Sequence, residues 1–138
     1  MKPLLEQLNG LDALIGHAMG GLQVQLQPIP GRVPVLQLSI EGREELPIFV
    51  TGSDMQILCL VHLWKEAEVQ PARRAELQAT LLDLNPAVPL SSFGRVGDRY
   101  VLYGALRRDA SAADVAQDIA VLSDNAIDAL EAMAEFLA

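Results

Sequence analysis

Residues 22–64 read LQVQLQPIPGRVPVLQLSIEGREELPIFVTGSDMQILCLVHLW and contain four apolar runs separated by turn residues. In residues 22–27 every second residue is Gln and the others are apolar, an alternation typical of a strand with one buried face. Residues 33–40, 46–51 and 56–64 are similar runs, and Pro, Gly and charged residues lie between them. Because no helical stretch separates the four runs, we expect an antiparallel meander.

Helical periodicity appears on both sides of this meander. Regularly spaced leucines predict a helix over residues 3–15, weakened by Gly10 and followed by a glycine-rich loop over residues 16–21. A second helix is expected over residues 71–84, where Asn85-Pro86 ends it.

The remaining elements lie after the second helix. Two apolar stretches, residues 88–96 and 99–106, are joined by Gly97-Asp98 and predict a β-hairpin. After Ser111, apolar residues recur at steps of three and four, which predicts a helix over residues 111–137 with its acids on the other faces. The order α-β-β-β-β-α-β-β-α predicts an α+β fold, in which helices cover one face of an antiparallel sheet. We expect residues 1–138 to form a single domain.

Composition restricts the class of protein. The chain has 138 residues, of which 51% are hydrophobic and 20% are charged, so intrinsic disorder is excluded. No apolar run is long enough to cross a bilayer and no signal peptide is recognisable, so we expect no membrane insertion. The single cysteine, Cys59, has no intrachain partner, which favours a reducing compartment and predicts a cytoplasmic protein.

The net charge of −8 is concentrated at one end of the chain. Residues 109–138 contain seven acidic residues and no Lys or Arg, which argues against nucleic-acid binding through this segment. Two interpretations remain open for the last helix: a solvated face, or a docking face for a basic protein partner. On the second interpretation the candidate contact residues are Asp124, Asp128, Glu131 and Glu135.

A search for reactive groups yields little. Cys59 and His62 are three residues apart on an expected strand, so they point to opposite faces, while His17 lies in a distant loop. We therefore expect no metal site and no cofactor, and we interpret Cys59 as a buried, inert core thiol. The strongest candidate for a small-molecule or catalytic site is the pair Arg95 and Arg99, which could hold an anion on the hairpin.

Two apolar features point to association with proteins. Trp64 ends a strand next to a charged stretch and is either a lid on the core or an anchor for a partner. Aliphatic helices that exceed what one sheet can bury favour self-association, so we expect a homodimer.

Several segments carry a resemblance to a known family: residues 85–94 (NPAVPLSSFG), 100–106 (YVLYGAL) and 122–131 (LSDNAIDALE), with LPIFV at 46–50. The chain resembles the YjfI-like proteins, small bacterial cytoplasmic proteins of unknown function, from about residue 20 to the end. This resemblance implies no catalytic residues, because the family has none established.

The element order is also similar to that of the type III secretion chaperones and the YbjN-like proteins. Those proteins are small, acidic and leucine-rich, commonly dimerise and bind extended peptide segments, although the present chain has an apparent extra strand. We therefore predict a non-enzymatic, protein-binding module that acts as a chaperone or adaptor. The alternatives are a small-molecule or enzymatic site at Arg95 and Arg99, or a structural subunit of a bacterial stress-related or envelope-associated assembly.

Overall fold

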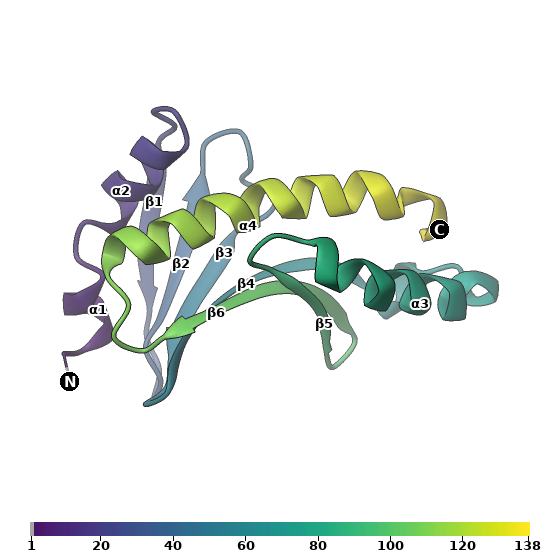
Figure 1. Ribbon diagram of the computed structural model, residues 1–138, viewed down its shortest axis with the longest axis horizontal. Helices are drawn as coiled ribbons and strands as arrows, with labels where there is room; N and C mark the ends of the chain where they lie inside the picture. Colours follow the sequence, from purple (N-terminus) through teal and green to yellow (C-terminus); the bar gives the residue numbers. More distant parts are fainter. Residues whose placement is uncertain (1) are drawn as a thin grey trace.

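The computed structural model describes residues 2–138 and has the predicted α+β architecture (Figure 1). The helices are α1 (Leu4–Gln7), α2 (Leu11–Ala18), α3 (Arg74–Leu84) and α4 (Ala112–Met133). The strands are β1 (Val24–Ile29), β2 (Val35–Ile40), β3 (Ile48–Gly52), β4 (Gln56–Lys65), β5 (Ser92–Val96) and β6 (Arg99–Arg107). Short 3-10 turns extend this framework at Glu66–Glu68, Pro71–Arg73, Asn85–Ala87 and Ala134–Phe136.

The six strands form one sheet in the order β1-β2-β3-β4-β6-β5, and every neighbouring pair is antiparallel. The predicted meander is therefore confirmed for β1 to β4, and the predicted hairpin joins it through β6. Figure 1 shows α2 and α4 over the same face of the sheet, with α3 beyond the edge strand β5.

The larger of two hydrophobic clusters fills the space between the sheet and helices α1, α2 and α4. Inward-facing residues of β2 and β4 belong to the same cluster as the regularly spaced apolar residues of α4, as predicted from periodicity. Members that are no more than 2% exposed include Leu11, Leu36, Leu38, Ile57, Cys59, Val61, Val115, Ile119 and Leu122.

A second cluster lies under α3 at the other end of the molecule. There residues from the ends of β4 and β6 pack with residues of α3 and of the end of α4. This cluster consists of Trp64, Val69, Leu77, Leu81, Tyr100, Met133 and Phe136. Helix α3 packs on these residues, and a groove lies between this helix and the β5–β6 hairpin.

The prediction of a single helix over residues 3–15 was wrong, because this segment contains two helices. It is divided into α1 and α2 by Gly10, which has φ of 80°. A left-handed backbone interrupts a helix and is accessible to glycine at little cost. The loop predicted over residues 16–21 was also partly wrong, because α2 continues to Ala18; a Cβ at Gly16 would lie 2.7 Å from the Leu22 carbonyl oxygen, so only glycine fits there.

Strand β5 is shorter than predicted, beginning at Ser92 rather than at residue 88. Leu90 has φ of 59°, which breaks an extended conformation before the strand begins. The Asn125 side chain of α4 donates hydrogen bonds to the Pro89 carbonyl (2.9 Å) and to the Ser91 hydroxyl (3.1 Å). These contacts hold the segment before β5 against α4 and out of the ladder with β6, although the Leu90 carbonyl oxygen still lies over Gly104 of that strand.

Candidate functional site

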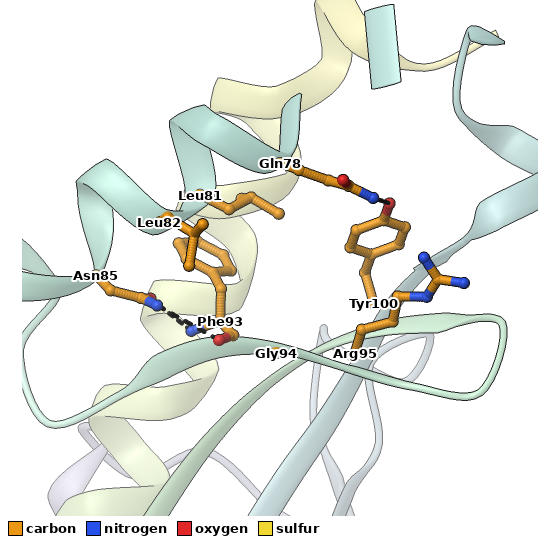
Figure 2. A pocket seen from close by; sticks show the side chains of 8 residues that line it. All are labelled: Gln78, Leu81, Leu82, Asn85, Phe93, Gly94, Arg95 and Tyr100. Carbon is orange, nitrogen blue, oxygen red and sulfur yellow. Dashed lines mark hydrogen bonds between the residues drawn. The ribbon is translucent and has the colours of Figure 1, made fainter. Parts of the chain in front are cut away.

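An apolar groove between α3 and the β5–β6 hairpin is the first candidate site (Figure 2). It encloses about 280 Å³. Leu81 and Phe93 form its inner wall and Leu82, which is 70% exposed, stands at its rim. The complete lining, hereafter the α3 groove, is Gln78, Leu81, Leu82, Asn85, Phe93, Gly94, Arg95 and Tyr100.

Asn85 occupies the outer edge of β5 in the way a neighbouring strand would. Its Oδ1 accepts a hydrogen bond from the Phe93 N–H (2.7 Å), and its Nδ2 donates to the Phe93 carbonyl (3.4 Å). Both backbone groups of Phe93 therefore point away from β6. Because an antiparallel ladder alternates, the backbone groups of Arg95 also point outward, beside the α3 groove.

Tyr100 forms the far wall of the α3 groove. Its hydroxyl accepts a hydrogen bond from the Gln78 amide (3.1 Å), and its ring stacks on Trp64 with centroids 5.7 Å apart. Trp64 itself is 2% exposed and belongs to the second hydrophobic cluster. The indole therefore supports the groove from behind and does not present its face to a partner.

A cluster of charged side chains lies beside Tyr100. Glu66 forms ion pairs with Arg74 and with Arg95, the second at 3.2 Å. The Tyr100 hydroxyl and the two guanidinium groups hold the pKa of the Glu66 carboxyl below its usual value. Because Glu66 already neutralises Arg95, a free anion would have to compete with this carboxylate.

The predicted anion-binding pair is not brought together. Arg95 lies directly opposite Tyr100, with its guanidinium 5.9 Å from the ring centroid, so it is on the face covered by helices. Arg99 precedes Tyr100 on β6 and therefore points to the opposite face. On that face burial lowers the pKa of the His62 imidazole, and the charge of Arg99 lowers it further.

The acidic residues predicted as partner contacts lie on the outer side of α4 and its last turn. Asp124 pairs with Arg43 (2.6 Å), and Glu135 pairs with Arg73 (3.3 Å). Asp128 and Glu131 are exposed, and within residues 2–138 neither forms an ion pair. Half of the predicted docking face is thus already neutralised by the chain itself.

Cys59 and His62 point to opposite faces of β4, as expected. Cys59 is fully buried, and burial raises the pKa of its thiol. His62 is half-buried on the face without helices and meets Phe49 edge to face, with centroids 5.6 Å apart. In the described part of the chain, no three His, Cys, Asp or Glu side chains are grouped so that they could hold a metal ion.

Asp118 was expected on a solvent-facing side of the last helix. That expectation was wrong: Asp118 is 6% exposed and faces the sheet at Gly104. Burial raises the pKa of its carboxyl from 3.8 to about 6. The signal was present, because Asp118 is three residues after Val115 and four before Leu122, which places it on the buried side of α4.

Comparison with known proteins places the chain in a family. Residues 6–137 match the bacterial family described as uncharacterized protein conserved in bacteria (DUF2170). The chain belongs to this family. The expectation of an uncharacterised bacterial family is therefore confirmed.

Two further comparisons concern curated and solved proteins. Among curated proteins, none matches this sequence. In three dimensions the chain is similar to a chain of the crystal structure of the ExsC–ExsE complex, with 14% identity and a TM-score of 0.47, covering 91% of this chain and 92% of that chain. Within residues 2–138, the helices are too short or too polar to cross a membrane.

Proposed function

We propose that the protein is a non-enzymatic protein-binding module that holds an apolar side chain of a partner in the α3 groove. The observation that carries this proposal is Leu82, which remains 70% exposed at the rim of a groove lined by Leu81 and Phe93. An exposed aliphatic residue beside an apolar pocket stabilises a complex by leaving water when a partner covers it. A chaperone or adaptor role follows from such binding.

The hydrogen bonding around the α3 groove favours an apolar partner over a polar small molecule. The amides of Gln78 and Asn85 are engaged by Tyr100 and Phe93, and the Arg95 guanidinium is engaged by Glu66. A polar ligand would therefore have to replace existing interactions. An apolar side chain needs no such replacement, because it contacts only the leucine and aromatic carbons.

The size of the groove supports the same choice. Its volume of about 280 Å³ lies just below the roughly 300–1,000 Å³ that encloses a small-molecule ligand. One or two side chains of a protein partner fit this volume. Binding at Arg95 and Arg99 is the less favoured alternative, because the two side chains lie on opposite faces of the hairpin.

A second copy of the chain is one candidate partner. Leu82, Leu84 and Leu90 follow one another closely along the chain and are 70%, 36% and 63% exposed. Association of two copies through these residues would cover apolar surface that a monomer leaves in water. We propose that this association, like capture of another protein, takes place in the cytoplasm, since the single thiol is buried and unpaired.

The test uses Leu82→Asp, which places a charge at the rim without touching the buried clusters. Met55→Asp is the matched control, because Met55 is also apolar and exposed (83%) but lies between β3 and β4. Tagged versions of the wild type and both variants are used to capture proteins from bacterial lysate, and each is analysed by sedimentation. Loss of a partner, or of the dimer, in Leu82→Asp alone is expected.

Three results would contradict the proposal. Capture and dimerisation that are equal in the two variants would exclude the α3 groove as the binding surface. A metabolite retained by the wild type in native mass spectrometry and lost in Arg95→Gln would favour a small-molecule site. A partner that is lost only when Asp124, Asp128, Glu131 and Glu135 are replaced together would move the binding surface to α4.

A further inference from the structure

In the described part of the chain, the last residues of β6 have an edge that no strand covers. They come after Tyr103, whereas the α3 groove contains Tyr100, near the beginning of the same strand. Strand β5 pairs with β6 only as far as Ser92 opposite Tyr103, whereas β6 continues to Arg107. On its other side this end of β6 is fully paired with β4, up to Gln56 opposite Arg107. In Figure 1 the arrowhead of β6 extends past β5 beneath the beginning of α4.

The backbone of Ala105 points to this open edge. The Phe93 backbone groups point away from β6, since Asn85 binds them, so the hydrogen-bonded partners across the hairpin are Ser92 with Tyr103 and Gly94 with Val101. Alternation along β6 then directs the N–H and C=O of Ala105 to the same side as those of Tyr103. No strand lies there to receive them within residues 2–138.

The edge is open because the preceding segment is held elsewhere. If β5 began earlier, Ser91 would pair opposite Gly104 and Leu90 opposite Ala105. Instead Asn125 holds this segment on α4, and Leu90 adopts φ of 59°, a conformation unfavourable for a leucine. Two separate features thus keep β6 accessible to another chain.

Asp118 lies directly above this edge. A Cβ at Gly104 would be 2.5 Å from its Oδ2, so the carboxylate occupies the space that a side chain would fill. This Oδ2 is buried and has no hydrogen-bond partner among the described residues. A buried carboxylate oxygen without a donor is an unusual feature, and a ligand that brings a donor would satisfy it.

These groups line one cavity of about 850 Å³, which also includes Leu90, Arg107 and Asp114. Arg107 pairs with Asp109 (3.4 Å), and no cation pairs with Asp114 or Asp118 in the part of the chain that the structure describes. The cavity is therefore acidic, with an exposed leucine at one corner. A basic ligand complements it, and an anionic one would be repelled.

We propose that the end of β6 and Asp118 form a peptide-binding site, the β6 edge site, which adds an extended segment as a strand beside Ala105 and pairs its Lys or Arg with Asp118. The added strand continues the line of β5, so its side chains alternate between the two faces of the sheet. A basic side chain on the α4 side reaches Asp118 and donates to the unpartnered oxygen. This site is separate from the α3 groove and does not require that groove to bind a partner.

The probe is a short synthetic peptide of alternating Thr and Val with one central Lys, compared with the same peptide carrying Gln at that position. Affinity is measured by titration at pH 7.5, and hydrogen exchange of the Ala105 amide is followed by NMR. The Lys peptide is expected to bind roughly tenfold more tightly than the Gln peptide and to protect the Ala105 amide. In Asp118→Asn this preference disappears, whereas Asp128→Asn, on the exposed side of the same helix, retains it.

Ala105→Pro provides a second test that does not rely on the carboxylate. Its N–H is not used in the pairing with β4, so the variant folds but can no longer donate to an added strand. Both peptides are expected to lose binding. The proposal is overturned if the Lys peptide binds without protecting Ala105, if Asp118→Asn keeps the preference, if Asp128→Asn loses it equally, or if Ala105→Pro binds as the wild type does. Absence of any shift at Ala105 with millimolar Lys peptide also overturns it.

Discussion

The two halves of α4 use acidic residues in different ways. In the second half and the turn after it, Asp124 and Glu135 are exposed, and each is paired with an arginine from another part of the chain. In the first half, Asp118 is buried between the helix and the sheet with an unpartnered oxygen. The difference shows that a high density of acidic residues in a sequence does not identify the carboxylate with the most perturbed pKa. Burial, which the sequence density does not report, has a large effect on that pKa.

The largest effect is expected from adding a methyl group beneath Asp118. In Gly104→Ala the new Cβ would be 2.5 Å from the Asp118 Oδ2 and 3.0 Å from the Leu90 carbonyl oxygen. The Asp118 carboxylate would have to turn within a buried site, and the Leu90 oxygen is backbone that cannot retreat without moving the segment before β5, so we expect a loss of about 3 kcal/mol in the free energy of unfolding. Urea denaturation measures this loss.

Gly31→Ala is the control for that substitution. The nearest atom to its Cβ would be 3.7 Å away, an ordinary contact, so its stability should stay within about 0.5 kcal/mol of the wild type. A second comparison combines Gly104→Ala with Asp118→Ala, which should recover part of the lost stability. An equal loss with and without the carboxylate would show that Asp118 does not press on Gly104.

Next in size is the effect of removing the buried charge. The pKa of Asp118 is raised from 3.8 to about 6 in the folded chain, so the folded state binds the proton more strongly than the unfolded state. Stability should therefore decrease as pH rises from about 4 to about 6, and the loss is complete above that range. Asp118→Asn removes this dependence and is expected to stabilise the chain at pH 7 by about 2 kcal/mol.

Thermal unfolding of the wild type and Asp118→Asn over this pH range tests the assignment. The two stability curves should converge near pH 4 and separate as the carboxylate ionises. Asp128→Asn serves as the control, since an exposed carboxylate should leave the shape of the curve unchanged. Parallel curves for the wild type and Asp118→Asn would mean that the buried carboxylate is not the group that titrates.

Cys59 lies opposite Gly104 on β4, beneath the same half of α4. Because the thiol is fully buried in the larger cluster, Cys59→Ala should cost about 1 kcal/mol through the cavity it leaves. Labelling of the native thiol by a bulky reagent should be slow and should accelerate with denaturant, as unfolding exposes it. Rapid labelling of the folded protein would contradict the burial of Cys59 and indicate a reactive thiol.

Much of the fold could be predicted because its elements have strong local patterns. Alternation identified β1, which spans Val24–Ile29 instead of the predicted residues 22–27. The strand ends later than predicted because Pro28 and Ile29 remain paired with β2, which an edge strand tolerates. Periodicity identified α4 and its cap, where the Ser111 hydroxyl accepts from the Asp114 N–H (3.1 Å). These features depend on residues that are neighbours in the sequence.

The candidate sites depend on contacts between distant residues, which no local pattern contains. Asn85 has a role only because α3 places its amide beside the free edge of β5. The register of the hairpin places Arg95 and Arg99 on opposite faces. Asp118 can be buried because the residue that faces it on β6 is Gly104, which has no side chain. Tertiary packing therefore decides which polar residues are accessible, paired or buried.

The smallest effects are expected in the second half of α4, where pairing should decide the sign. Asp128 is four residues from Asp124 on α4, and Glu131 is four residues from Glu135 in the 3-10 turn that follows. Asp128→Asn with Glu131→Gln relieves this repulsion and should stabilise the chain by a few tenths of a kcal/mol. Asp124→Asn with Glu135→Gln instead removes the pairs with Arg43 and Arg73, and should destabilise it by a similar amount. Both changes should shrink at high salt, because the charges are exposed and screened. Urea denaturation of the two double variants at low and high salt measures the signs, and changes of the same sign would show that the arginines do not compensate the acidic surface.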